Sequence, residues 1–309
     1  MKKISIVSPC FNEINNIGLI YSAFKVITAS LLDYSFEIIF IDNCSTDGTK
    51  ERLRELAAND PDLKIIFNVR NFGHNRSPYW GLLQASGDAV IIIASDLQEP
   101  PECITQLILE WEKGWKVVLA QNPTSEEGIL MKKTRETYYK LLNKISTVEL
   151  IQDANGFGIY DKKIIEYLSQ MNDPNPYIRG MVCEIGYPIK TITYTKKRRQ
   201  NDKSKNKLYQ LYDQAMLGIT SHSIVPLRIA SFVGYLLLVL SFFAFSLISV
   251  HKLNNWQTYF FWGEFLKISH YILFGLVFIF IGLLGEYNNS ILSYVRKRHM
   301  VIEEERINF

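Results

Sequence analysis

The chain contains the sequence FEIIFIDNCSTDG at Phe36–Gly48, where a near-continuous apolar run turns polar within one residue. The run from Phe36 to Ile41 has the length and the β-branched content of a strand that is buried on both faces. Strands of this kind occur in parallel sheets whose two faces are covered by helices. The polar segment that begins at Asp42 therefore predicts a loop at the carboxyl end of a strand in such a sheet.

The same alternation of strand and helix patterns continues over residues 1 to about 120. Strand patterns occur at Ile4–Ser8, Phe36–Ile41, Leu63–Phe67, Ala89–Ala94 and Lys116–Ala120. Helical spacing of apolar residues occurs at Asn15–Leu32, Thr46–Ala58, Pro78–Ala85 and Ile104–Lys113. This order predicts an α/β nucleotide-binding architecture with a mostly parallel sheet, in which ligands sit at the carboxyl ends of the strands.

Polar segments follow four of the predicted strands at that position. They are Pro9–Glu13, Asp42–Gly48, Arg70–Asn75 and Ser95–Pro101. One such segment alone could be turn and helix-cap chemistry, but four at one end of one sheet indicate a binding site. No G-x-G-x-x-G follows the first strand and no G-x-x-x-x-G-K-[ST] occurs in the chain, which disfavours a dehydrogenase or a P-loop enzyme.

Two long apolar segments lie near the C-terminus. The first, Ile229–Val250, has 22 residues and no charge, and as a helix it would reach about 33 Å, enough to cross the hydrocarbon core of a bilayer. The second is Ile268–Tyr287. Each is apolar on every face, which favours a transmembrane hairpin over a pair of core helices in a soluble protein.

The distribution of basic residues predicts the orientation of this hairpin. Arg228 precedes the first segment and Arg296 to Arg298 follow the second, whereas the connecting loop holds only Lys252 and Lys267. Positive charge favours the cytoplasmic side, so we expect both chain ends there and the short loop outside. The net charge of the whole chain is only +3, too small to indicate nucleic-acid binding. The four cysteines form no C-x-x-C pair, so neither a zinc site nor a disulfide framework is indicated.

The loop sequences, in this order, resemble the family 2 glycosyltransferases of the GT-A fold. The most specific matches are Pro9-x-x-Asn12-Glu13, Arg70-Asn71-Phe72-Gly73, Asp96-Leu97-Gln98-x-Pro100-Pro101 and Arg199 to Lys205. The chain is most similar to the polyprenyl-phosphate branch, which includes dolichyl-phosphate mannose synthase and bacterial undecaprenyl-phosphate glucosyltransferases. With the hairpin, the resemblance implies a cytosolic catalytic domain at 1–207, a juxtamembrane amphipathic helix at 208–228, two transmembrane helices at 229–289 and a cytoplasmic tail at 290–309.

The resemblance also implies roles for individual residues. Asp96 is expected to hold Mg²⁺ or Mn²⁺ against the donor diphosphate, and Gln98 and Asp153 are the other catalytic candidates. Residues expected to bind the nucleotide-sugar donor are Pro9, Asn12, Glu13, Asp42, Asn43, Arg70 and Ser95. Residues expected to bind the phosphate of the acceptor are Arg199, Ser204 and Lys205.

Three positions depart from the family pattern. Ala94 stands at the first acid of the D-x-D motif, and Asn43 replaces the usual second aspartate of a pair. Gly156 stands where many relatives carry a proposed catalytic base. A phosphate monoester acceptor is already anionic near neutral pH, so it needs positioning and donor activation more than removal of a proton.

The implied function is transfer of a hexose, with inversion, from a nucleotide-diphosphate sugar such as UDP-glucose to polyprenyl (undecaprenyl) phosphate. The implied location is the cytoplasmic face of the plasma membrane, in a multi-pass and homo-oligomeric protein. One alternative is a processive polysaccharide synthase, but none of the five tryptophans follows an arginine as its Q-x-x-R-W motif requires. The other alternative is a non-catalytic lipid-binding scaffold, suggested by Ala94 and Gly156.

Overall fold

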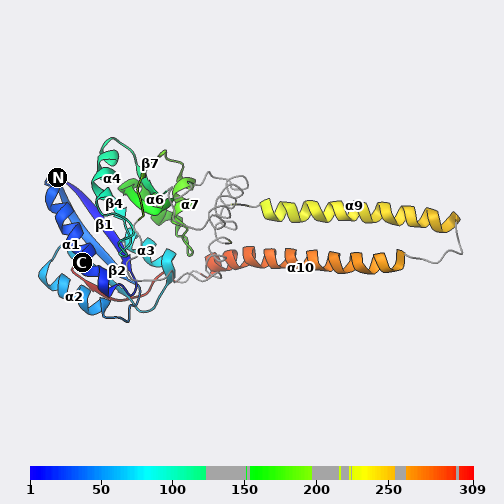
Figure 1. Ribbon diagram of the computed structural model, residues 1–309, viewed down its shortest axis with the longest axis horizontal. Helices are drawn as coiled ribbons and strands as arrows, with labels where there is room; N and C mark the ends of the chain where they lie inside the picture. Colours follow the sequence, from blue (N-terminus) through cyan, green and yellow to red (C-terminus); the bar gives the residue numbers. More distant parts are fainter. Residues whose placement is uncertain are drawn as a thin grey trace.

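The computed structural model describes residues 1–122, 151, 154–196, 216, 223, 225–254, 262–296 and 299–309, apart from some side chains in the two long helices. Figure 1 shows an α/β domain from which these two helices project side by side. The predicted residues Asp153, Arg199, Ser204 and Lys205 lie outside the described part, as does most of the segment 208–228.

The described part of the α/β domain contains one sheet of eight strands in the order β7-β5-β6-β4-β1-β2-β3-β8. Their bounds are β1 Lys2–Cys10, β2 Tyr34–Asp42, β3 Leu63–Asn68, β4 Ala89–Ile92, β5 Val117–Gln121, β6 Ala154–Asp161, β7 Ile189–Thr193 and β8 Glu303–Ile307. Strand β1 runs parallel to β2 and β4, and β2 runs parallel to β3. In this register Cys10 lies opposite Asp42, so the loops after β1, β2 and β4 leave the sheet at the same end.

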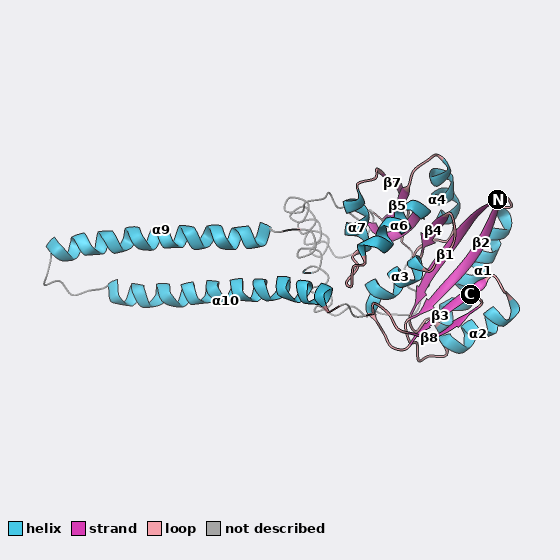
Figure 2. Ribbon diagram, turned by 180° about the vertical axis from the view of Figure 1, so that it is seen from behind, coloured by secondary structure: helices cyan, strands magenta, loops and turns pink. Residues whose placement is uncertain are grey.

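Helices cover both faces of this sheet (Figure 2). One face carries α1 (Ile14–Ser30), α2 (Thr49–Asn59) and α4 (Cys103–Glu112), and the other carries α3 (Gly73–Leu83), α6 (Lys162–Met171) and α7 (Ile178–Ile185). Within β2, Ile38 and Phe40 join the first core, whereas Ile39 and Ile41 join the second. This two-sided burial explains the continuous apolar run in the sequence.

The five predicted strands and four predicted helices of residues 1–121 are confirmed, and α3 shows the largest shift of a boundary. Helix α3 begins at Gly73, whereas the sequence suggested Pro78. The side chain of Asn71 accepts a hydrogen bond from the Gly73 amide at 2.8 Å, which starts the helix early. Pro78 then lies inside the helix.

The last residues of the chain return to the sheet, which the sequence analysis did not foresee. It assigned 290–309 to a tail, but β8 pairs antiparallel with β3, so that Ile307 lies opposite Ile65. The amide of Val69 donates to the carbonyl of Ile302 at 3.1 Å, and the Trp80 indole donates to Glu303. The mixed sheet therefore contains the C-terminus as well as the N-terminal strands.

The two long helices are α9 (Val225–Asn254) and α10 (Trp262–Val295), and they contain both predicted apolar segments. Within α10, Leu273–Val295 is long and apolar enough to cross a membrane, with a mean hydropathy of 1.4, and none of it is buried. The apolar stretch found in the described part of α9, Val225–Leu237, is shorter. Large apolar side chains are exposed on both helices, including Phe242 and Phe278.

Candidate active site

The loops after β1 and β2 are tied together by Asn12 and Glu13. The Asn12 side chain accepts a hydrogen bond from the Thr46 backbone amide at 2.8 Å. The Asn12 backbone amide donates to the Ser45 hydroxyl at 2.8 Å. The Glu13 amide donates to the Thr49 hydroxyl at 3.0 Å. The structure thus gives both residues a direct part in shaping this end of the sheet.

Asp42 lies at the end of β2 and is completely buried. One carboxylate oxygen accepts a hydrogen bond from the Ser45 amide at 2.9 Å, and the Cys10 thiol faces the other. Burial raises the pKa of Asp42, although these hydrogen bonds and the charge of Lys50 oppose the shift. The carboxylate of Asp42 is therefore closed to solvent in this conformation.

Asn43 makes four hydrogen bonds between the loops after β2 and β3. Its amide nitrogen donates to the Asn71 side chain at 2.9 Å and to the Gly73 carbonyl at 3.2 Å. Its amide oxygen accepts from Phe72 at 2.8 Å and from Asn68 at 3.2 Å. An aspartate could not make the two donations, so the geometry accounts for an amide at this position.

Ser95 and Arg70 occupy contrasting positions. The buried Ser95 hydroxyl donates to the Pro9 carbonyl at 3.0 Å and lies 2.7 Å from the Ser8 hydroxyl, which fixes the loop after β4 against β1. Arg70 is exposed, and its guanidinium lies over the Phe72 ring, 4.0 Å from the ring centre. Arg70 is therefore accessible to a ligand at this end of the sheet.

The loop after β4 carries two acids, Asp96 and Glu99. Asp96 is half-buried, and its side chain accepts from the Gln98 amide at 3.2 Å. Glu99 is buried and accepts from the Ala94 amide at 2.8 Å and from the Asn155 side chain. Burial, followed by the nearby charge of Asp96, raises the pKa of Glu99 to about 7, against those two hydrogen bonds and the charge of Lys196.

These two acids fit a divalent cation of the Mg²⁺ or Mn²⁺ type. Such ions prefer carboxylate oxygens and commonly use one or two of them, with phosphate oxygens and water in the remaining positions. A cation beside Asp96 would also relieve the repulsion that raises the pKa of Glu99. The described residues contain no group of three or more His, Cys, Asp and Glu side chains placed to hold a metal.

Backbone conformations that are rare for residues other than glycine gather in these loops. Asn12, Cys44 and Leu97 have φ angles of +56°, +66° and +58°, and they follow β1, β2 and β4 respectively. Left-handed backbone is costly for a residue such as leucine, and residues of this kind concentrate at functional sites. Asparagine adopts this conformation readily, so local strain is indicated in the loops after β2 and β4.

Strand β6 supplies two residues of the candidate site, one that was noted in the sequence and one that was not. Gly156, which stands where the family resemblance implied a catalytic base, has a φ of +97° and open space where a side chain would begin. Its neighbour Asn155 contacts Glu99. Asn155 was not predicted from the sequence, because its contact with Glu99 depends on β6 lying beside β4.

Comparison with known proteins identifies the family. The family description "Glycosyl transferase family 2" matches residues 5–168. The chain belongs to glycosyl transferase family 2. It is 34% identical to the bactoprenol glucosyl transferase of Shigella phage SfV over 96% of both chains. It is 31% identical to the uncharacterized glycosyltransferase YkcC of Bacillus subtilis (strain 168), over 97% of this chain and 93% of that protein.

A solved structure also resembles this family 2 glycosyltransferase in part. It is glucosyl-3-phosphoglycerate synthase from Mycobacterium tuberculosis in complex with UDP, which covers 71% of this chain and 78% of its own. The sequence identity is 20% and the TM-score is 0.47. The family assignment depends on the sequence comparisons and not on this likeness.

Proposed function

We propose that this glycosyltransferase moves glucose, or a similar hexose, from a UDP-sugar to a polyprenyl phosphate at a membrane surface. The observation that carries the proposal is the end-to-end match to a bactoprenol glucosyl transferase, which includes the region of the two long helices. The site supports it as well, since an accessible acid and an accessible arginine lie at the carboxyl end of the sheet.

In this proposal Asp96 binds a divalent cation at the donor diphosphate, with Glu99 beside it. When bound, Mg²⁺ or Mn²⁺ would neutralise the charge that builds up on the departing nucleotide. Arg70 contacts the diphosphate from the loop after β3, and Gln98 orients the sugar. Asp42, Asn43, Asn12 and Glu13 hold the loops around the donor in position.

The acceptor phosphate attacks the anomeric carbon in line with the leaving diphosphate, which inverts the configuration. The phosphate is already anionic, so the reaction needs no base at the position of Gly156. For the acceptor we retain Arg199, Ser204 and Lys205, whose guanidinium, hydroxyl and ammonium groups suit a phosphate. Asp153 remains a catalytic candidate.

The membrane arrangement is part of the same proposal. Helices α9 and α10 would both cross the bilayer, making the protein multi-pass, with domain limits near 208, 229 and 290. Two features support the placement of both ends of the hairpin on the same side of the membrane. Strand β8 pairs with β3 in the sheet of the N-terminal domain, and basic residues flank the hairpin. By the charge rule this side is cytoplasmic.

A nucleotide-release assay tests the role of the acid. Purified protein is mixed with UDP-glucose, undecaprenyl phosphate and Mg²⁺ or Mn²⁺, and Asp96→Asn is expected to lower turnover by about 100-fold or more, because a charged ligand of the diphosphate site is lost. The exposed Asp33→Asn is the matched control and should release UDP at the wild-type rate.

Full activity in Asp96→Asn would refute the role of Asp96. Absence of UDP release by the wild-type protein with every donor and either metal would instead favour the non-catalytic scaffold. Far-ultraviolet circular dichroism on each variant separates a loss of chemistry from a loss of fold.

A further inference from the structure

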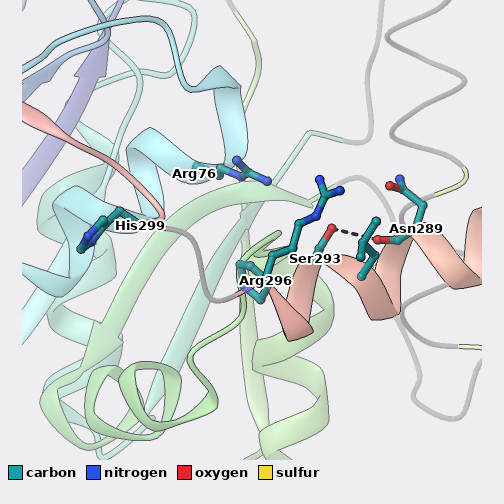
Figure 3. A pocket seen from close by; sticks show the side chains of 7 residues that line it. Arg76, Asn289, Ser293, Arg296 and His299 are labelled. Carbon is teal, nitrogen blue, oxygen red and sulfur yellow. Dashed lines mark hydrogen bonds between the residues drawn. The ribbon is translucent and has the colours of Figure 1, made fainter.

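A pocket of about 100 Å³ lies where the C-terminal end of α10 meets the α/β domain. Its lining residues come from α3, from the loop after α6, from the last turns of α10 and from the segment that leads to β8. They are Arg76, Pro174, Asn289, Leu292, Ser293, Arg296 and His299. Figure 3 shows the side chains of Arg76 and Arg296 directed toward the same space, whereas the His299 ring is turned away from them.

The polar lining is basic and contains hydrogen-bond donors. Arg76, Arg296 and His299 contribute cationic or ionisable nitrogen, and the lining includes no acidic residue. Within the described part of the chain, no carboxylate forms an ion pair with any of these three residues. The pocket therefore offers positive charge to an anion.

Arg76 is held in place on the domain side of the pocket. Its side chain is half-buried and donates to the side chain of Asn175. Burial lowers its pKa, the charge of Arg70 adds to this effect, and Asp173 opposes it. Asp173 itself accepts a hydrogen bond from the Asn175 amide at 2.8 Å. The guanidinium of Arg76 thus carries a burial cost that an incoming anion would offset.

The helix side of the pocket adjoins apolar surface. Leu292 lines the pocket and is 42% exposed, and its neighbours Ile291 and Val295 are more exposed still. These residues belong to the segment of α10 that is long and apolar enough to span a membrane. An anion bound here would have hydrocarbon-compatible surface directly beside it, which a small soluble anion would not use.

We propose that this pocket binds the phosphate head group of an anionic membrane lipid, with the lipid chains along the exposed face of α10. Arg76 and Arg296 donate to the phosphate oxygens from opposite sides, and the Asn289 side-chain amide adds a donor, whereas the Ser293 hydroxyl already donates to the Asn289 carbonyl at 2.9 Å. Arginine suits this role because its planar guanidinium can donate two parallel hydrogen bonds to a phosphate. The bound lipid then links the domain to the end of the membrane helix. The inference rests on the membrane arrangement proposed above, but it requires no catalysis.

Lipid binding to the purified full chain in a neutral detergent tests the inference. Isothermal titration calorimetry is performed with short-chain phosphatidylglycerol, with phosphatidylcholine of the same chain length and with inorganic phosphate. We expect phosphatidylglycerol to bind at least about tenfold more tightly than either of the others. Arg296→Gln and Arg76→Gln are each expected to weaken its binding about tenfold, because a charge-assisted hydrogen bond is lost.

The exposed Arg52→Gln, in α2, is the matched control and should bind phosphatidylglycerol as the wild type does. Arg296 is exposed, so Arg296→Gln keeps the test valid if the half-buried Arg76 variant fails to fold. Equal affinity for phosphatidylglycerol in Arg296→Gln and wild type would overturn the inference. Equal affinity of the wild type for phosphatidylcholine, or for inorganic phosphate, would overturn it as well.

The same titration separates this inference from the proposed function. Asp96→Asn should bind phosphatidylglycerol normally while failing to release UDP. A wild-type protein that binds the lipid through Arg296 but transfers no sugar would sink the proposed function and leave the lipid site standing.

Discussion

Phenylalanine occupies opposite environments in the two regions of this protein. In the α/β domain Phe24 and Phe40 are completely buried, with ring centres 6.2 Å apart between α1 and β2. In the two long helices Phe242 is 71% exposed and Phe278 is 70% exposed. Apolar surface on this scale is costly in water. The difference teaches that the domain makes its own apolar interior, whereas the described side chains of the two helices leave large apolar surface exposed.

The domain also stabilises a buried charge by surrounding it with hydrogen-bond donors and cations. Glu37 on β2 is 2% exposed, and its carboxylate accepts hydrogen bonds from Ser5 at 2.5 Å and from Lys64 at 2.9 Å. Ser86 and Lys3 complete the set. Burial by itself would raise the pKa of Glu37, but these contacts outweigh it and lower the pKa to about 2.

The largest effect is expected from a substitution that disrupts this buried network. Glu37→Gln should lower the free energy of unfolding by about 3 kcal/mol at neutral pH, because the lysines lose their charged partner. The carboxylate stabilises the wild type fully above about pH 4.5, and this contribution is lost as the pH falls toward about 2. Denaturant unfolding of the α/β domain between pH 2 and pH 7 measures both effects.

In the variant the part of the pH dependence between about 4.5 and 2 should disappear. The exposed Glu55→Gln serves as the control and should change stability by less than about 0.5 kcal/mol. An unchanged pH profile in Glu37→Gln would show that this carboxylate does not stabilise the folded domain.

The next prediction compares the introduction of a lysine at an exposed apolar position in each of the two regions. Phe278→Lys on α10 should disfavour membrane insertion by about 3 kcal/mol, because a charge is placed on the apolar face of a spanning helix. Leu109 on α4 is also exposed, but it faces water, so Leu109→Lys should be nearly neutral. The fraction of protein recovered in membranes, rather than in aggregates, is the measurement. Equal recovery of both variants would mean that α10 does not face lipid.

The smallest effect concerns the loops of the candidate site. Asn43→Asp should lower the free energy of unfolding by about 1–3 kcal/mol, because two donated hydrogen bonds are lost and a carboxylate faces the Gly73 carbonyl. Asn15→Asp, exposed in the first turn of α1, should not lower it, since a negative charge is favourable there. Thermal melting of the two variants tests this, and equal melting temperatures would show that the two donated hydrogen bonds add nothing.

Most of the domain could be predicted because its signals are local. The apolar runs of β1 to β5 are continuous in sequence, and the polar loops that follow β1, β2 and β4 do meet at one end of the sheet. Strand β8 escaped prediction because Glu303, Glu304 and Glu305 read as a polar tail. At the edge of the sheet Glu304 and Glu305 are exposed and pair with Lys50 and Arg54 on α2.

Like strand β8, contacts between strands that are far apart in the sequence were hard to predict. The Glu99–Asn155 contact requires β6 to insert antiparallel between β4 and β5, and no local pattern in the sequence encodes that order. Likewise, the resemblance predicted that Asn43 binds the nucleotide-sugar donor. In the structure its side chain makes hydrogen bonds that connect two loops. Whether it also touches the donor stays a prediction.

One measurement tests the central claim directly, that the acceptor is a lipid phosphate held beside the membrane helices. Wild-type protein is incubated with UDP-glucose that carries a radiolabel in the sugar, with undecaprenyl phosphate and with Mg²⁺ or Mn²⁺, and the lipid is then extracted into organic solvent. The account predicts label in the lipid fraction in a one-to-one ratio with released UDP, and none when undecaprenyl phosphate is omitted. UDP release that continues without the lipid, or label that stays in water with every donor sugar tried, would contradict it.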